Sequence, residues 1–394
     1  LSLFTCELKC LEKRFLKDTR TVSEVLGEGL NGEKRVSRRL TLSVCLCCHL
    51  AAGGPRTHSQ MSGSRVGFCL SDKKRRRINL DAFADFCAGH GVEVVEIDLT
   101  QPLVPQGPFD VIVQKLSDVI VEAEHDSQSQ QLLVNFQSYV SAHPSTVLLD
   151  PLPAMTQLLD RFASYRIMSK LHKSLRECCI CTPPYLEIHS ASDLSSIQQA
   201  VTTQGLSFPL ICKTRVAHGS LSHEMSLIFS AGSLADIHPP CVLQSFVNHG
   251  AVLHKVFVVG DRHFCVERPS IKNFPSGPCE RKTIFFNSHQ LDEQIPCLPP
   301  PSSEALAALV RELRVQLGMA LFGVDVIINI HTHTLTVIDI NIFPGYEGVP
   351  QFFSSLLSHI KSVLDKQVSA GPQATGCPEL RQTAGIPSAA TTGL

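Results

Sequence analysis

Several features are missing from this chain of 394 residues, and each absence narrows what the chain could do. Positive and negative residues are nearly balanced: the chain has 35 Lys and Arg residues and 36 Asp and Glu residues, which gives a formal net charge of -1. Without a strong overall field, we expect no binding to nucleic acid or to a membrane surface through bulk charge. Any anionic ligand must then be held by local groups of Lys, Arg and His.

A membrane-spanning run is missing as well. The most apolar stretch follows basic residues within 35–54, but its run of about 12 apolar residues is too short to cross a bilayer. A cleaved signal or a palmitoylated patch in this stretch stays open as an alternative. No N-x-[ST] sequon occurs, and most of the 16 cysteines lie inside apolar runs, among them Cys69, Cys87, Cys212 and Cys241. This pattern is typical of buried thiols in a reducing compartment and predicts a cytoplasmic protein.

Two nucleotide-binding signatures are absent. The chain has no G-x-x-x-x-G-K-[ST] and no H-R-D or D-F-G, which excludes the P-loop NTPases and the protein kinases. GEGLNG at 27–32 satisfies G-x-G-x-x-G, but it follows no convincing strand and leads into no clean helix. The Cys-x-x-Cys pairs Cys45/Cys48 and Cys178/Cys181 are too far apart for the short loops of zinc ribbons, so no zinc site is expected.

The sequence divides into four parts. Residues 1–60 lack a sustained amphipathic period and are interpreted as a disordered or non-native extension, with Met61 as the start of the folded protein. Residues 61–150 and 151–367 carry the regular patterns of folded domains, and 368–394 read as a low-complexity, disordered tail. At 43% hydrophobic and 18% charged residues, the whole has the composition of an ordinary globular protein with a large core.

Residues 61–150 alternate strands and helices. The pattern predicts strands at 65–70, 92–98, 110–115 and 146–150, a helix over 79–91 with Asn79 as its N-cap, and a helix over 127–142. This βαβ rhythm implies a parallel sheet. Ligands of such sheets bind beyond the carboxyl ends of the strands, which places Lys73, Lys74 and Lys115 where they could meet an anion. A solvated surface or a nuclear-localisation-like patch remains the alternative for the run SDKKRRR.

Residues 151–367 form the larger part. We expect a long helix over 155–175 with Arg161 near its start, helices over 192–203 and 303–317, and a closing helix over 348–367. The strand at 208–215 carries Lys213 and leads into the polar loop VAHGSLSHEM, an arrangement that can fold backbone amides over phosphates. Residues 241–260 read as strand, short polar link and strand.

The stretch from Leu321 to Val349 carries the strongest chemical signal. Two short β-branched runs flank a turn at 331–334, which predicts a hairpin. Asp339 and Asn341 are two residues apart and point to one face of their strand, and Asp325 lies on the partner strand. Uncompensated carboxylates are costly to bury, and hard oxygen ligands suit Mg²⁺, so the hairpin predicts a magnesium site. The alternative is that these side chains are satisfied by backbone groups or water.

Segments from Arg65 to Gln367 closely resemble the inositol-tetrakisphosphate 1-kinase family (inositol 1,3,4-trisphosphate 5/6-kinases). The resemblance rests on FPLICKTRVAHGSLSHEM, PPCVLQSFVNHGAVLHKVFVVG, RPSIKNF, IFFNSH, LFGVDVIIN and VIDINIFPGYEGVP. It implies an α/β protein of the ATP-grasp fold, in which a small parallel α/β domain precedes two α+β subdomains that clasp ATP. The implied activity is ATP- and Mg²⁺-dependent phosphorylation of inositol 1,3,4-trisphosphate at position 5 or 6 and of inositol 3,4,5,6-tetrakisphosphate at position 1.

The resemblance also implies roles for individual residues, with two Mg²⁺ ions, ATP as co-substrate and a monomeric enzyme. The expected ATP contacts are Arg161, Lys213, Gln244, Ser245, Phe246, Val247, Asn248, Lys255, Ser270 and Ser288, with 244–248 framing the adenine. The expected metal ligands are Asp325, Asp339 and Asn341. The expected inositol phosphate contacts are Lys74, Lys115, His223, Lys255, Asn341 and Gly345. Lys213, His223, Lys255 and Asp339 are the expected catalytic set.

One departure and two alternatives remain open. A serine that the family uses near the nucleotide falls at Asp292 here, where an acidic group could weaken nucleotide binding. An ATP-grasp ligase that forms an acyl phosphate is a second reading, and an inositol-phosphate-binding scaffold with weak catalysis is a third. The basic elements SDKK and KTRVAHGSLSH favour a polyanionic acceptor over the ligase, and the retained metal-binding and phosphate-binding residues argue against the scaffold.

Overall fold

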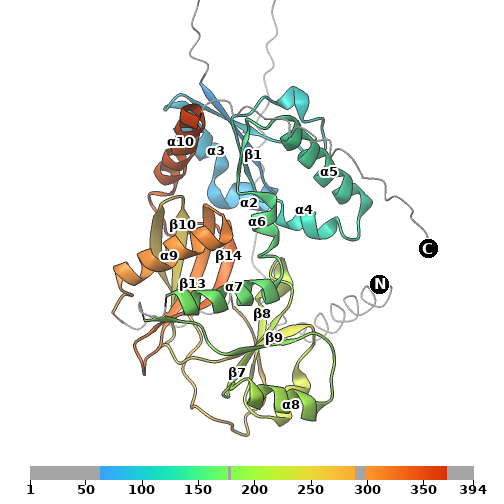
Figure 1. Cartoon of the computed structure of the whole chain (residues 1–394), viewed down its shortest axis with the longest axis vertical. Helices are drawn as coiled ribbons and strands as arrows, with labels where there is room; N and C mark the ends of the chain where they lie inside the picture. Colours follow the sequence, from blue (N-terminus) through green and yellow to red (C-terminus); the bar gives the residue numbers. More distant parts are fainter. Residues whose placement is uncertain (1–62, 176–178, 289–298, 371–394) are drawn as a thin grey trace, which may run out of the picture. The chain divides into compact units, whose positions relative to one another are not determined.

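The computed structural model describes residues 63–175, 179–288 and 299–370 (Figure 1). Within these ranges the strands form three β-sheets. Several predictions fall outside the described residues: the extension over 1–60 with its GEGLNG and Cys45/Cys48, the thiol of Cys178, the substitution at Asp292, and the tail from 371 onward.

The first sheet is the parallel sheet that the sequence predicts. Its strand order is β2-β1-β3-β4, and every neighbouring pair is parallel. The elements are β1 Ser64–Cys69, α2 Asp72–Ile78, α3 Leu80–Ala88, β2 Val92–Glu96, a 3-10 turn at Val104–Gln106, β3 Val111–Gln114, α4 Ser117–Glu122, α5 Ser127–Ala142 and β4 Val147–Leu149. The four predicted strands and the helix at 127–142 are confirmed; β1 has the predicted length but begins one residue earlier, and the other three strands are shorter than expected.

The basic run SDKKRRR after β1 forms the helix α2. The sequence pattern predicted no secondary structure there. α2 ends at Asn79, whose φ of 54° is left-handed, and α3 begins immediately after it. Asn79 therefore stands at the predicted N-cap position, but its side chain makes no capping hydrogen bond. The helix turns Lys74 toward the interior, and this side chain is only 6% exposed.

The middle sheet is antiparallel, with the order β12-β8-β7-β9-β6. Its strands and the helices between them are β6 Tyr185–Ile188, α8 Leu194–Thr203, β7 Leu210–Thr214, a 3-10 turn at Ser220–His223, β8 Glu224–Ile228, a 3-10 turn at Gly232–Asp236, β9 Cys241–Ser245 and β12 Ile284–Asn287. Asp193 caps α8 by accepting from the backbone N–H of Ser196. The predicted helix at 192–203 and the predicted strands around Lys213 are confirmed.

The C-terminal sheet has the order β11-β10-β13-β14-β5. Its members are β5 Ile180–Cys181, β10 Val252–Val259, β11 Arg262–Pro269, β13 Leu321–Ile328 and β14 Leu335–Ile342, and α7 Arg161–Ser174 and α9 Ser303–Leu317 pack against them in one apolar core. β13 and β14 form the predicted hairpin, in which Asp325 lies opposite Asp339 and Gly323 lies opposite Asn341. The three oxygen-bearing side chains therefore come together on adjacent strands, as predicted.

The polar link at 246–251 runs from one sheet to the other. The sequence predicts strand, link and strand over 241–260, and the structure confirms both strands. β9 belongs to the middle sheet, however, and β10 belongs to the C-terminal sheet. Asn273 holds the link by accepting from the backbone N–H groups of His249 and Gly250 at 3.0 and 2.9 Å. The link is thus a fixed bridge between two sheets.

The prediction of one long helix over 155–175 is wrong at its N-terminal end. The structure divides this stretch into α6 Leu152–Thr156 and α7, and residues 157–160 are not helical. Asp160 ends the break because its carboxylate accepts from the N–H of Phe162 and caps α7. The backbone of Asp160 also forms a β-bridge to Val216. A tertiary contact therefore competes with local helix propensity at this point.

The last helix ties the C-terminal end to the first sheet. α10 Phe352–Ala370 begins four residues later than predicted and continues through 368–370, which the sequence assigned to the disordered tail. It packs beside α3 (Figure 1), and Phe353 lies edge-on to Phe83. These residues share one core with Val66, Phe257 and Leu321. The parallel sheet and the C-terminal sheet therefore bury a common apolar interior.

The four thiols predicted to be buried, Cys69, Cys87, Cys212 and Cys241, all lie in the core. None of the helices in the described ranges combines the length and the apolar character that a membrane crossing requires.

Asp150 joins the end of the parallel sheet to the start of β13. Its carboxylate is buried and accepts from the backbone N–H groups of Ala320 and Leu321 at 2.7 and 2.8 Å. Burial raises the pKa of Asp150 to about 6, although the two backbone hydrogen bonds act in the opposite direction. The ordinary value is 3.8, so the folded chain holds a proton between about pH 4 and 6 that the unfolded chain releases.

This difference predicts a pH-dependent stability. A raised folded-state pKa contributes stability that is fully present below the unfolded value and is lost as the pH rises through the folded value. We expect the unfolding free energy of the wild type, relative to Asp150→Asn, to fall by roughly 2 kcal/mol between pH 4 and 7. Urea denaturation of both proteins across this range measures the difference. A difference that stays flat or rises with pH contradicts the prediction.

Candidate active site

A cleft of about 380 Å³ lies between the middle sheet and the C-terminal sheet. Side chains from β7, β8, β9 and β12 line one wall, and side chains from β10, β11, β13 and β14 line the other. Most of the residues singled out in the sequence meet here: Arg161, Lys213, His223, Gln244, Phe246, Val247, Lys255, Ser270, Ser288, Asp325, Asp339 and Asn341. Residues separated by up to 180 positions in the chain thus share one cavity.

Asp325 has the environment of a cation ligand. Its Oδ1 is buried and makes no hydrogen bond within the described residues, and the Lys255 Nζ lies 3.6 Å away. Burial raises the pKa of Asp325, and the charge of Lys255 works against that rise. The amide nitrogen of Asn341 is likewise buried without a hydrogen-bond partner. The unpaired carboxylate oxygen of Asp325 would gain from a bound cation, and the amide of Asn341 could contribute its carbonyl oxygen.

The donor set fits Mg²⁺. No group of three or more His, Cys, Asp or Glu side chains in the described ranges could hold a metal ion, so the candidate set consists of the two carboxylates of Asp325 and Asp339 and the amide of Asn341. Mg²⁺ is commonly held by one or two carboxylates and completes its octahedron with water and the oxygens of substrate phosphates. A site with few protein ligands at the edge of an open cleft meets this description.

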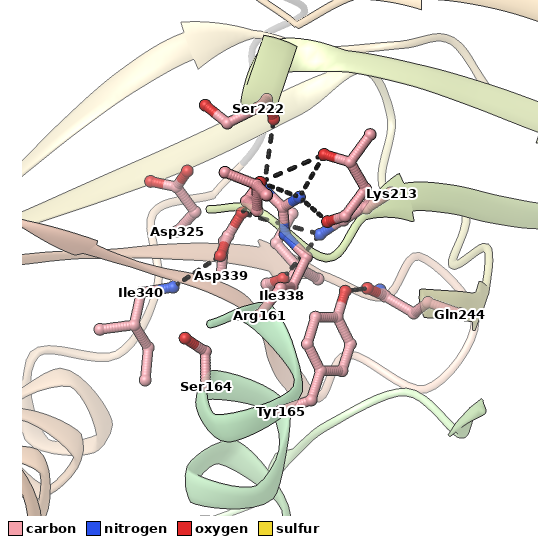
Figure 2. A network of polar contacts seen from close by, with 12 residues as sticks. Arg161, Ser164, Tyr165, Lys213, Ser222, Gln244, Asp325, Ile338, Asp339 and Ile340 are labelled. Carbon is pink, nitrogen blue, oxygen red and sulfur yellow. Dashed lines mark hydrogen bonds and ion pairs between the residues drawn. The ribbon is translucent and has the colours of Figure 1, made fainter. Parts of the chain in front are cut away.

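Asp339, one of the predicted metal ligands, lies close to two buried cations. Its Oδ2 is 3.8 Å from Lys213 Nζ and 3.9 Å from a terminal nitrogen of Arg161, and its Oδ1 accepts from the N–H of Ile340 at 3.0 Å. Lys213 also donates to the carbonyl of Ile338 at 2.9 Å. In Figure 2 the side chains of Lys213, from β7, and Arg161, from the start of α7, converge on this carboxylate. Both cations are 3% exposed, so their positions are fixed before a ligand arrives.

Arg161 also holds the polar loop that follows β7. Its guanidinium donates to the carbonyls of Thr214, Val216 and Ser222, the last at 3.2 Å (Figure 2). Arg161 is the first residue of α7, directly after the N-cap Asp160. The loop expected to cover phosphates is therefore anchored at both of its ends by one side chain. His223 at the end of the loop accepts through its carbonyl from the N–H of Ser288 at 3.0 Å.

Part of the cleft lining is apolar, and we call this part the apolar slot. Its aliphatic and aromatic members are Ile211, Met225, Phe246, Leu253, Ile271, Phe286, Ile327 and Ile338. Flat aromatic ligands bind in slots of this kind, with a few polar groups fixing their orientation. Gln244 accepts from the hydroxyl of Tyr165 (Figure 2), which fixes one such group. The arrangement can accommodate a purine base.

His249 is a cleft residue that the sequence did not single out. Its Nδ1 lies 2.7 Å from the carbonyl of Val247, and its Nε2 lies 2.7 Å from the hydroxyl of Ser270. Burial lowers the pKa of His249, so the neutral ring donates from Nδ1 and accepts the Ser270 proton at Nε2. Ser270 is thereby oriented at the mouth of the slot.

Some predicted site residues do not line the cleft. Ser245 is buried and accepts from the N–H of Ser207, and the Asn248 side chain exchanges two hydrogen bonds with the backbone of Phe274. The two side chains hold the link in place, and any ATP contact there would come from their backbone groups. Lys74 and Lys115 donate to the carbonyl of Phe343, at 2.9 and 3.3 Å. Burial lowers the pKa of both lysines.

Gly345 does not itself line the cleft, but the side chains of Arg77 and Glu347 that lie against it do. Arg77, Arg268 and Glu347 line the cleft but were not singled out in the sequence. A Cβ on Gly345 would collide with the carboxylate of Glu347 and with the guanidinium of Arg77. The only local signal for Arg77 was its membership of the basic run SDKKRRR, which did not distinguish it from its neighbours.

Two domain families match the chain. The pre-ATP-grasp domain of inositol 1,3,4-trisphosphate 5/6-kinase matches residues 65–155, and the ATP-grasp domain of the same kinase matches residues 174–362. Both matches fall on the sheets described above. The ATP-grasp fold predicted from the sequence is therefore confirmed.

Named relatives extend over most of the chain. The chain is 48% identical to inositol-tetrakisphosphate 1-kinase of Danio rerio over 82% of this chain and 83% of that protein, and 47% identical to the Xenopus laevis protein of the same name over 78% and 80%. Among solved structures, D-cycloserine synthetase has a TM-score of 0.51 at 13% identity, covering 76% of this chain and all of the other. That likeness concerns the fold alone. Taken with the domain matches, these similarities show that the chain belongs to the inositol 1,3,4-trisphosphate 5/6-kinase family.

Proposed function

We propose that the chain transfers the γ-phosphoryl group of ATP to a hydroxyl of an inositol phosphate. The acceptors would be inositol 1,3,4-trisphosphate, at position 5 or 6, and inositol 3,4,5,6-tetrakisphosphate, at position 1. The observation that carries the proposal is a single cleft with an apolar slot, two facing carboxylates and cations from both walls. The relatives named for this activity support it.

Residues on the middle sheet would hold the nucleotide. The slot would take the adenine, with Gln244 and the link 246–248 at its edge, and Ser270 and Ser288 would lie beside the nucleotide. Lys213 and Arg161 would meet the phosphates, because both are buried cations at the carboxylate of Asp339. The anchored loop 214–223 would exclude water from the phosphates.

The hairpin would hold the metal. Asp325, Asp339 and Asn341 would ligate Mg²⁺, and we propose two ions for this site. Bound Mg²⁺ neutralises charge that develops on the transferring phosphoryl group. The chain's own contribution at this point is to fix the two carboxylates opposite each other on paired strands.

Residues 61–150 and the end of β14 would supply the acceptor side. A polyphosphorylated inositol and ATP repel each other, so His223 and Lys255 would neutralise the acceptor, and Lys74, Lys115 and the backbone at Gly345 would lie around it. Lys74 and Lys115 both donate to the carbonyl of Phe343, and after burial the charge of Lys115 helps to lower the pKa of Lys74. Phosphoryl transfer then requires mainly positioning and charge neutralisation by these groups.

Product analysis tests this function directly. The purified chain is incubated with Mg-ATP and each acceptor, and the products are separated by anion-exchange chromatography. We expect inositol tetrakisphosphate from the trisphosphate and inositol pentakisphosphate from the tetrakisphosphate, with one ADP formed for each. ADP formation with amino acids and not with inositol phosphates would instead support the ATP-grasp ligase. Binding of inositol phosphates without any ADP formation would support the scaffold. Light scattering of the same sample tests the proposed monomer.

A further inference from the structure

The carboxylate of Glu347 occupies the acceptor end of the cleft. It forms an ion pair with Arg77 of α2, and the two side chains lie directly against the backbone of Gly345. All three positions border the place where the proposed function puts the acceptor. In this structure an acidic side chain therefore sits among the cations expected to bind phosphate.

The backbone around Glu347 is held by hydrogen bonds, whereas its side chain is partly exposed to solvent. The guanidinium of Arg268 donates to the Glu347 carbonyl at 2.8 Å, and the hydroxyl of Tyr346 donates to the carbonyl of Val258 at 2.7 Å. The Glu347 and Arg77 side chains are 40% and 46% exposed. A pair with this exposure is weak and readily exchanged. The carboxylate can therefore rotate away without disturbing the segment that carries it.

The neighbouring charges are mostly positive. Burial acts to raise the pKa of Glu347, but Arg77 and Lys74 help to hold it below its ordinary value. The pKa of Lys115 is lowered mainly by burial and also by the charges of Arg77 and Lys73, while the acidic Asp118 and Glu347 act against this shift. Glu347 is thus a carboxylate beside Arg77 and Lys74 of α2 and near Lys115, the residue that follows β3. A phosphate ester carries about -1.5 to -2 charge at neutral pH and offers three acceptor oxygens, so it can replace a carboxylate in such a place.

We propose that Glu347 is an internal counter-anion that a phosphate of the acceptor displaces from Arg77, and that it thereby sets how many phosphates an acceptor must carry. The inference rests on the proposed function. When an inositol phosphate carries a phosphate at this end of the cleft, that phosphate replaces the Glu347 carboxylate as the partner of Arg77. An acceptor without that phosphate leaves the Glu347–Arg77 pair in place and meets a carboxylate that repels its other phosphates.

Replacing Glu347 by Gln tests the inference because the two possible roles predict opposite signs. As a displaceable counter-anion, Glu347 opposes binding, so Glu347→Gln is expected to lower the Kd for inositol 1,3,4-trisphosphate by roughly five-fold in calorimetry without ATP. The KM for the acceptor falls with it, while the KM for ATP is unchanged. The decrease in Kd caused by Glu347→Gln is expected to be larger for an inositol bisphosphate than for the tetrakisphosphate. Glu347→Ala is expected to show the same direction.

Two controls accompany this experiment. Glu187 pairs with Arg166 outside the cleft, so Glu187→Gln removes a comparable pair and should leave acceptor binding unchanged. In the double variant with Arg77→Gln, the gain from Glu347→Gln should disappear. Unchanged or weaker binding by Glu347→Gln, in a protein whose wild type phosphorylates inositol phosphates, overturns the inference alone. A wild type that neither binds nor phosphorylates any inositol phosphate overturns the proposed function and the inference with it.

Discussion

Replacing Asp339 by Asn is expected to lower turnover by at least about 10³-fold, which corresponds to roughly 4 kcal/mol of transition-state stabilisation. Asp339 lies opposite Asp325 in the hairpin and within 4 Å of both Lys213 and Arg161. Asn keeps the shape of the side chain but removes one of the two carboxylates available to a cation. The same change leaves two buried cations without their counter-charge. The proposed metal site and the proposed phosphate contacts therefore fail together.

The measurement is kcat with inositol 1,3,4-trisphosphate at saturating ATP, repeated over a Mg²⁺ titration. We expect the Mg²⁺ concentration for half-maximal activity to rise as well, while circular dichroism shows an intact fold. Asp261→Asn is the matched control, because Asp261 is exposed and pairs with Arg314 away from the cleft. Turnover and Mg²⁺ dependence like those of the wild type in Asp339→Asn would contradict the assignment of the metal site.

The hairpin that carries Asp339 could be predicted from the sequence because its signals are local. Two β-branched runs and a short turn specify paired strands, and the two-residue period of a strand places Asp339 and Asn341 on one face. The register of the pair then brings Asp325 opposite Asp339. The parallel sheet was predictable for the same reason, since alternating strand and helix patterns leave few topologies open.

Features that depend on contacts between distant segments could not be predicted in this way. The break before α7 depends on the bridge between Asp160 and Val216 across the fold, and its one local signal is Asp160 itself, a residue type that often caps a helix. The separation of β9 and β10 into different sheets is invisible in the local pattern.

The same limitation applies to the ends of the cleft. The sequence pointed to Lys73 and Lys74 in the basic run, but the side of α2 that faces the cleft includes Arg77, whose partner Glu347 is 270 residues away. Asn248 was expected at the nucleotide, yet its side chain supports the link from Phe274. Residue type and spacing indicate which groups could bind an anion, but only the tertiary arrangement decides which of them face it.

Replacing Lys213 by Met is expected to lower kcat/KM for ATP by about 10²- to 10³-fold, the range found when a single preorganised donor is removed from an active site. Lys213 is nearly fully buried, donates to the carbonyl of Ile338 and lies 3.8 Å from Asp339. Its charge is held in place between the two sheets, where it would meet the phosphates of ATP without further reorganisation. Met fills a similar volume without the charge.

The Mg²⁺ dependence of the remaining activity distinguishes the role of Lys213 from that of the metal ligands. Because Lys213→Met retains Asp325, Asp339 and Asn341, we expect the Mg²⁺ concentration for half-maximal activity to stay near that of the wild type, in contrast to Asp339→Asn. Lys361→Met, which removes an exposed lysine of α10 that contacts the His90 carbonyl, serves as the matched control. An unchanged kcat/KM in Lys213→Met would show that the phosphates bind elsewhere. A shifted Mg²⁺ requirement would instead show that Lys213 acts by positioning Asp339, since the two groups form one buried ion pair.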